Sequence, residues 1–157
     1  MSRSLKRVTA ALDAAGLPGR PVEMAASTRT AAEAAQAVGA QIDQIAKSIL
    51  FVGSESGGLC LFLTAGGRQV DPQAAERLAR EPLGRADAAQ VRALSGFAIG
   101  GVAPLGLTGP VRIWADPRLL EFAEVWAAAG TPRHVFPADP SQLVAACGAE
   151  VTEFSTV

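Results

Sequence analysis

The 157-residue sequence contains no tyrosine, a single histidine and only two cysteines. His134, Cys60 and Cys147 belong to no cluster with metal-ligand spacing, so we expect no metal site. Both cysteines stand in apolar stretches, "GLCLFL" and "VAACGAE", which predicts buried, reduced thiols. No glycine-rich stretch matches the strand–GxGxxG–helix pattern of a nucleotide-binding loop, and we expect no cofactor.

Long apolar runs are also absent, because none reaches the ~20 residues that cross a bilayer. The N-terminal stretch lacks the apolar segment of a secretory signal, so we expect a cytoplasmic protein with no membrane partner. The net charge of −1 argues against nucleic-acid binding by bulk electrostatics and would require a local basic patch. Arg3, Lys6 and Arg7 are the better candidates for such a patch. The arginines expected on solvated helix faces instead are Arg77, Arg80, Arg85 and Arg92.

Helical and strand-like patterns alternate along the chain. Asp-Pro pairs at 71–72, 116–117 and 139–140 each predict a helix start, because aspartate caps the first turn and proline fits its first position. Two further starts carry capping boxes, Thr30 with Glu33 and Asp87 with Gln90. The predicted helices are 4–16, 28–39, 72–81, 88–96, 117–130 and 140–148. The predicted strands are 20–24, 45–52, 58–65, 111–115, 134–137 and 150–154.

This interleaving with short loops predicts the α/β class, in an α+β variant with a mixed sheet. The length suits one compact domain, and no linker or internal repeat divides the chain. We therefore expect a single domain over residues 1–157.

Lys47 is one of only two lysines and stands inside the most apolar strand-like run, "QIAKSILFV". On a strand it shares a face with Ile45, Ile49 and Phe51, and the opposite face is also largely apolar. One interpretation is a lysine whose stem packs while its ammonium reaches solvent. The other is a partly desolvated ammonium at the mouth of a pocket, placed to hold a phosphate or a carbonyl oxygen.

The segment from Gly96 to Pro110, "GFAIGGVAPLGLTGP", contains five glycines and two prolines, so it cannot form a regular helix. Such a loop can present backbone N–H and C=O groups to a ligand. The alternative is a structural turn between two strands.

Four stretches together carry a family resemblance: "STRTAAEAAQAVGAQIDQIAKSILF", "LTAGGRQVD", "GFAIGGVAPLG" and "EVWAAAGTPRHVFPADPSQLV". In this order, over nearly the whole chain, they resemble the YbaK / prolyl-tRNA synthetase-associated editing domain family. The resemblance implies a mixed, barrel-like β-sheet flanked by helices. It also implies deacylation of mischarged aminoacyl-tRNA, with the acceptor end of the tRNA as partner and an aminoacyl-tRNA synthetase as a second partner left open.

The same resemblance implies which residues form the site. Lys47 corresponds to the essential lysine of the family, and the catalytic role falls to it. The family's G-x-x-x-P loop corresponds to the segment that starts at Gly100. The residues that the resemblance implies for substrate binding are Ser48, Gly100, Gly101, Val102, Ala103 and Pro104.

Rival sites are weaker on their sequence context. His134, Asp139 and Ser141 are local neighbours around a helix start without a nucleophile elbow, so Asp139 and Ser141 are better interpreted as capping residues. Cys60 has no basic neighbour that would activate its thiol.

The sequence leaves two functions open. The first is a free-standing trans-editing deacylase for a small amino acid such as Ala, Cys or Ser. The second is a non-catalytic tRNA- or synthetase-binding module with the same fold.

Overall fold

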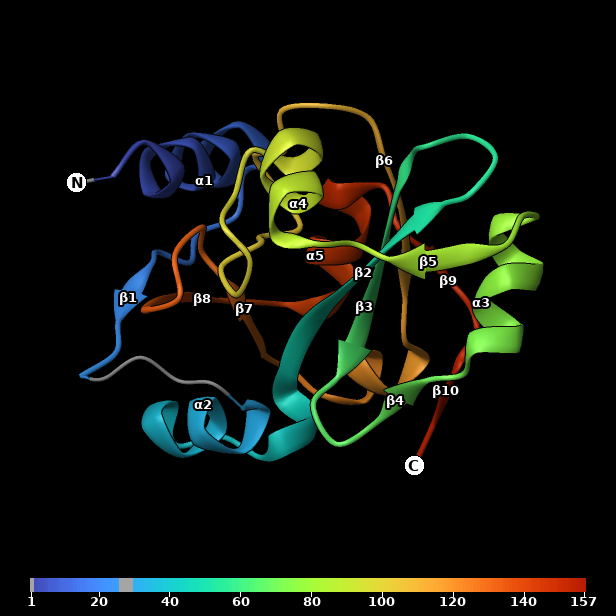
Figure 1. Ribbon diagram of the computed structural model, residues 1–157. Coiled ribbons are helices and arrows are strands. Elements are labelled where there is room, and N and C mark those ends of the chain that lie inside the picture. The colour runs from blue at the N-terminus through green and yellow to red at the C-terminus, as the bar shows by residue number, and fades with distance from the viewer. Residues whose placement is uncertain (1, 26–29) are drawn as a thin grey trace.

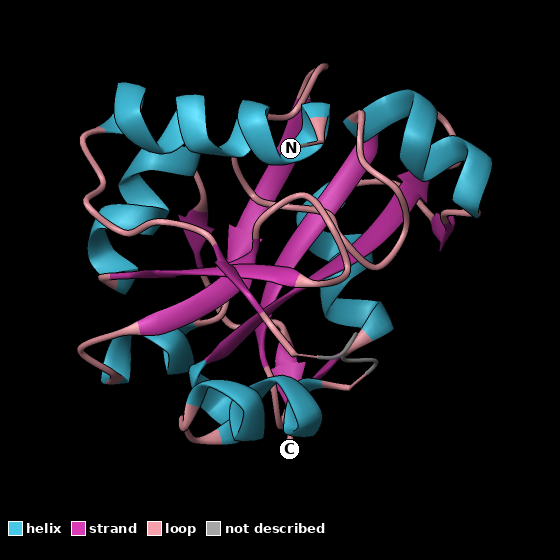
Figure 2. Ribbon diagram, turned by 90° about the vertical axis from the view of Figure 1, so that its left-hand side faces the viewer, coloured by secondary structure: helices cyan, strands magenta, loops and turns pink. Residues whose placement is uncertain are grey.

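The computed structural model describes residues 2–25 and 30–157, and Figure 1 traces the chain. Strands form the centre and helices lie around them, as the view in Figure 2 shows. The α-helices are α1 (Arg3–Ala15), α2 (Ala31–Val38), α3 (Pro72–Ala79), α4 (Ala88–Ser95) and α5 (Pro140–Cys147), and two 3₁₀ helices are η1 (Ile42–Gln44) and η2 (Pro117–Glu121).

A mixed sheet has the strand order β1-β8-β7-β2-β3-β6-β9, with β5 also paired to β2. β2 is antiparallel to β3 and parallel to β7, and β3 is parallel to β6. A separate two-stranded sheet joins β10 to β4. The strands are β1 (Val22–Glu23), β2 (Ile45–Gly53), β3 (Leu59–Ala65), β4 (Gln69–Val70), β5 (Leu83–Arg85), β6 (Val111–Ala115), β7 (Val125–Ala128), β8 (His134–Ala138), β9 (Glu150–Val151) and β10 (Ser155–Thr156).

Strand β3 contributes residues to two hydrophobic clusters of the core. Its sequence "LCLFLTA" is largely apolar on both faces and buried at every position. Leu61 and Leu63 belong to the large core that also holds residues of α1, α4 and α5. Phe62 belongs to a second cluster under α3, where its ring stacks on Trp114 with centroids 4.8 Å apart. The predicted mixed sheet with flanking helices is therefore confirmed.

Side-chain hydrogen bonds confirm the predicted capping residues at the helix starts. Asp71, Asp116 and Asp139 each accept a hydrogen bond from the backbone N–H two residues ahead, at 3.1, 3.0 and 2.9 Å. The side chain of Thr30 accepts from the N–H of Glu33 at 3.1 Å, which confirms the N-cap of α2. The first two residues of the predicted helix 28–39 lie outside the described residues.

The predicted helix 117–130 is wrong. Asp116 starts only the 3₁₀ helix η2, and the chain then becomes strand β7, whose Val125 and Ala127 are buried and whose alternate residues are not. β7 pairs with both β2 and β8, and this pairing outweighs the helical preference of the alanines. The predicted strand 150–154 is shorter than expected, at Glu150–Val151, and it pairs with β6. Within the described residues, no helix is long and apolar enough to cross a membrane.

Candidate active site

A cavity of about 490 Å³ lies beside β2, between this strand, the glycine-rich loop after α4 and the turn before β8. Its walls are mainly apolar, and three cationic or ionisable side chains reach it, Lys47, Arg85 and His134. Small residues of β7, Ala127 and Ala128, leave the space open on one side. The larger apolar side chains of the wall are Met24, Ile45, Ile49, Leu50, Phe51, Val91, Ile99, Val102, Trp126, Pro132 and Val135.

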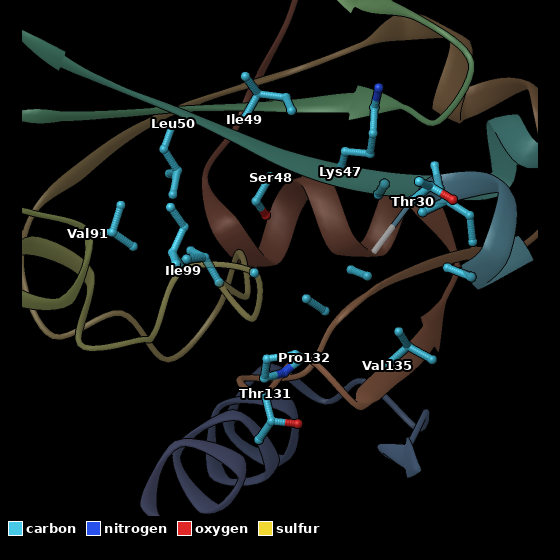
Figure 3. A pocket seen from close by; sticks show the side chains of 18 of the residues that line it. Thr30, Lys47, Ser48, Ile49, Leu50, Val91, Ile99, Thr131, Pro132 and Val135 are labelled. Carbon is cyan, nitrogen blue, oxygen red and sulfur yellow. The ribbon is translucent and has the colours of Figure 1, made fainter. Parts of the chain in front are cut away.

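Lys47 and Ser48 are consecutive on β2, so their side chains leave the strand in opposite directions. Figure 3 shows Ser48 pointing into the cavity and Lys47 pointing away from its centre. The Ser48 hydroxyl is buried and, within the described residues, has no hydrogen-bond partner. Because an unpaired buried hydroxyl is costly, Ser48 is a candidate for contact with a ligand.

The ammonium of Lys47 donates a hydrogen bond to the carbonyl oxygen of Arg68 at 2.7 Å. Burial lowers the pKa of Lys47 below its ordinary value, and the nearby carboxylates of Asp43 and Asp116 oppose this shift. Lys47 is half-buried, so neither simple interpretation from the sequence describes it fully. The carbonyl group of Arg68 holds the ammonium.

The turn that supplies this carbonyl is itself fixed by Asp43. One carboxylate oxygen of Asp43 accepts from the N–H of Gly67 at 2.8 Å, and the other pairs with Nε of Arg118 at 2.9 Å. These hydrogen bonds contribute to a lowered pKa at Asp43, against an opposing effect of burial that is the largest single influence. Asp43 therefore stays ionised at neutral pH and keeps the Lys47 anchor in place.

The loop from Gly100 to Pro104 passes the cavity with Gly100 and Val102 among its lining residues. Gly100 has φ of +90°, a conformation that favours glycine. A Cβ on Gly101 would lie 2.7–2.9 Å from backbone atoms of Thr131, so this glycine allows two loops to touch. Ala103 and Pro104 are buried behind the wall and, with Gly101, are not among the described lining residues.

Two backbone donors of this loop have no acceptor within the described residues. In the stretch 97–105, the N–H of Gly101 donates to the carbonyl of Ala98 at 3.1 Å. The N–H groups of Gly100 and Val102 donate no hydrogen bond within residues 2–25 and 30–157. The loop can therefore offer donors to a ligand, as the sequence suggested.

Thr131 and His134 form a polar pair in the cavity wall, with Oγ1 and Nδ1 2.6 Å apart. Thr131 also accepts from the N–H of Arg133 at 3.2 Å, which fixes its hydroxyl. Thr131 could not be predicted from the sequence, because a threonine before a proline in a loop carries no functional signal by itself. Arg85, expected on a helix face, lies instead on β5 and lines the cavity.

Helix α1 supports the glycine-rich loop through Arg7. Its guanidinium donates to the carbonyls of Gly96 and Gly106 at 2.8 and 3.1 Å, and it lies 4.6 Å from the centre of the Phe97 ring. Because its guanidinium already bonds to carbonyl groups of the protein, Arg7 does not belong to the basic patch expected from the sequence. Arg3 and Lys6 are exposed.

The described residues hold no group of three or more His, Cys, Asp or Glu side chains that could bind a metal ion. Within the described residues, one ammonium, one hydroxyl without a hydrogen-bond partner and two backbone N–H groups without an acceptor instead surround a mainly apolar cavity in a mixed α/β fold. The chain belongs to the aminoacyl-tRNA editing domain family, whose sequence model matches residues 25–146.

Three known proteins illustrate what this chain is similar to. One crystal structure, described as a "putative trans-editing enzyme for prolyl tRNA synthetase", is 48% identical with a TM-score of 0.91, covering 100% of this chain and 99% of that one. The crystal structure of hypothetical protein APE2540 is 30% identical with a TM-score of 0.87, covering 96% and 99%. The uncharacterized protein YwhH of Bacillus subtilis (strain 168) is 28% identical over 77% of this chain and 76% of its own length.

Proposed function

We propose that this protein is a free-standing trans-editing deacylase, which hydrolyses the ester between a small amino acid and the 3′ adenosine of a mischarged tRNA. The proposal rests on one observation. Around a single cavity lie Lys47, Ser48 and the N–H groups of Gly100 and Val102, which have no acceptor within the described residues. Family membership supplies the class of substrate.

The reaction does not require a strong protein nucleophile, because an aminoacyl ester is already activated. Water adds to the carbonyl carbon, the bond to the ribose oxygen breaks, and that oxygen leaves with a proton. Stabilising the negative charge on the carbonyl oxygen and positioning the ester are sufficient tasks for the protein. The loop N–H groups suit the first task.

Lys47 suits the binding of a negatively charged oxygen, either a phosphate or the developing oxyanion. Its four-carbon stem is flexible, so the ammonium can exchange the Arg68 carbonyl for a substrate oxygen. Partial burial strengthens such an interaction relative to water. Ser48, Gly100 and Val102 contact the substrate directly in this proposal, and Gly101, Ala103 and Pro104 hold the loop in position.

Small substrates fit the proposal because the cavity also has to admit the terminal adenosine or lie beside it. Alanyl, cysteinyl and seryl groups are the candidates. Apolar walls separate such near-isosteres poorly, with one methylene worth ~1–3 kcal/mol, so we expect overlapping rather than exclusive specificity.

A deacylation panel tests the proposal. Purified protein is incubated with alanyl-, cysteinyl-, seryl- and prolyl-tRNA, and loss of the ester is followed, with the Lys47→Ala variant as matched control. We expect faster ester loss on at least one of the first three and none on prolyl-tRNA. Binding of a charged tRNA without ester loss would favour the non-catalytic module, and no accelerated ester loss from any of the four would overturn the deacylase.

A further inference from the structure

Strand β2 has an unpaired stretch on one edge. β3 covers the other edge from Ala46 to Val52. On the open side, β7 pairs only with Ile45 and Ala46, and β5 pairs only from Phe51 onward. Residues 47–50 therefore have no strand partner on this side within the described part of the chain.

Alternation along β2 decides which backbone groups face this gap. Gly53 faces the β3 side, because its N–H donates to Gly58 and its carbonyl accepts from Gly57. Ser54 faces the other side, where its N–H donates to Pro82 next to β5. Successive residues of a strand direct their N–H and C=O groups to opposite edges, so those of Ser48 and Leu50 point to the same side as those of Ser54. The N–H and C=O of Ser48 and the N–H of Leu50 therefore face the gap.

The cross-strand neighbour gives an independent check. Ser48 lies opposite Leu63 of β3, and the carbonyl of Leu63 accepts from Asp116, on the side away from β2. Ser48 and Leu63 are thus a pair that exchanges no hydrogen bonds, as expected if the Ser48 peptide groups face the gap.

The cavity extends across this gap. Arg85 and Ala86 line it from the β5 side, Ala127 and Ala128 line it from the β7 side, and Ser48 lies between them. The Ser48 hydroxyl, buried and unpaired, points into the same space. One residue of β2 therefore brings a carbonyl, an N–H and a hydroxyl to the cavity.

The cavity contains no acidic side chain among its described lining residues, and two of those residues, Lys47 and Arg85, are cationic. A positively charged ligand group must therefore find its acceptors in backbone carbonyls and hydroxyls. An aminoacyl ester carries such a group, the α-ammonium, two bonds from a carbonyl that accepts hydrogen bonds. A strand residue uses the same combination, an N–H donor and a C=O acceptor, to form hydrogen bonds with the neighbouring strand.

We propose that the open edge of β2 binds the aminoacyl group as though it were one residue of a missing strand. The α-ammonium donates to the carbonyl of Ser48, and the ester carbonyl accepts from the N–H of Leu50. This inference rests on the proposed function and names how its substrate is oriented. It makes a free, primary α-amine a requirement of the site.

Binding of two non-hydrolysable analogues tests this inference on the wild-type protein. The probes are 3′-alanylamino-3′-deoxyadenosine and its lactyl counterpart, in which a hydroxyl replaces the α-ammonium. Loss of a charge-assisted hydrogen bond predicts that the lactyl compound binds about 10- to 100-fold more weakly by calorimetry. Equal affinities, or no binding of the alanyl compound, would overturn the inference.

Two variants test the edge itself. Leu50→Pro removes the N–H that faces the gap, whereas Leu50→Ala shortens the side chain further and keeps the N–H. We expect Leu50→Pro to bind the alanyl compound at least about tenfold more weakly than Leu50→Ala, with both folded by circular dichroism. Matched affinities in folded protein would contradict the proposed edge. If Leu50→Pro does not fold, the comparison of the two analogues decides.

The outcome is separable from that of the proposed function. Preference for the alanyl compound together with no hydrolysis of any charged tRNA would support the binding edge and reject the deacylase. Hydrolysis of a charged tRNA with equal binding of the two analogues would do the reverse.

Discussion

Lys47 combines an energetic cost with a position beside the candidate site. Burial lowers the pKa of its ammonium, so the charged form is less stable in the folded protein than in water. By the sign of this shift, the folded state binds fewer protons, and this residue alone makes stability rise with pH as the ammonium titrates. Its carbonyl partner offsets only part of the cost.

The first prediction follows from that cost. Lys47→Met should leave the melting temperature unchanged or raise it, because an apolar stem replaces a partly desolvated charge. Deacylation should fall by about 10²–10³ if the ammonium stabilises substrate charge. Thermal melting and single-turnover deacylation of the same preparation check both expectations.

Lys47→Arg is the matched control, since it keeps the charge. The guanidinium is larger and planar, so we expect poor recovery of activity at a site fitted to a compact ammonium. Near-normal activity of the Met variant would instead show that Lys47 only packs against the strand.

The second prediction compares alanine substitutions at two adjacent glycines, Gly100 and Gly101. We expect the first substitution to reduce activity more and the second to reduce stability more. Gly101→Ala places a Cβ 2.7–2.9 Å from the Thr131 backbone, and backbone cannot rotate away, so overpacking should cost about 1–3 kcal/mol. Gly100→Ala meets nothing closer than 4.0 Å and costs mainly its positive φ, about 1–2 kcal/mol.

Because Gly100 lines the cavity, its variant should lose more single-turnover rate per folded molecule, whereas Gly101→Ala should show the lower melting temperature. A Gly100→Ala protein with wild-type activity would return the loop to a purely structural role.

At the scale of elements, the sequence predicted best where local chemistry decides. The Asp-Pro pairs and the Thr30 and Asp87 caps act over three residues and are visible in the sequence. The region 117–130 fails because two partner strands, distant in sequence, recruit Val125–Ala128. The same limit applies to the site, since Lys47 and the loop could be selected from their composition but Thr131 and the gap in β2 arise from tertiary pairing.

The hairpin between β2 and β3 yields the third prediction, which concerns pH. Glu81 accepts from the N–H groups of Glu55 and Ser56 at 3.0 and 2.9 Å and from Arg112 at 2.6 Å. Hydrogen bonds from Ser56 are the main cause that lowers the pKa of Glu81 to about 2. A depressed carboxyl pKa stabilises the fold above the unfolded value, and that stabilisation is lost as pH falls from about 4.5 towards about 2.

Glu81→Gln should remove this acid-sensitive part of stability. The difference between the denaturant midpoints of wild type and variant should narrow as the pH falls from 7 to 3. A constant difference between the two proteins over this range would show that the charge of Glu81 does not stabilise the hairpin.

At the scale of the whole molecule, the helix that fixes the glycine-rich loop lies outside the part that defines the family. The family model covers 25–146, whereas Arg7 of α1 holds Gly96 and Gly106. The site is therefore completed by an N-terminal element, whose apolar face, Leu5, Val8 and Leu12, enters the main core.

The net charge of −1 gives the last prediction, because it leaves only local cations to meet a tRNA backbone. Lys47 and Arg85 line the cavity and Arg133 follows its wall residue Pro132, so two or three phosphate contacts are the expected number. Affinity for uncharged tRNA should then be weak and should fall roughly 7- to 40-fold between 50 and 200 mM salt. Arg85→Gln should make that salt dependence shallower, and Arg77→Gln, on the exposed face of α3, should not. Filter-binding titrations across salt concentrations measure both, and tight binding that ignores salt, or equal effects of the two variants, would place the RNA contact on another face of the protein.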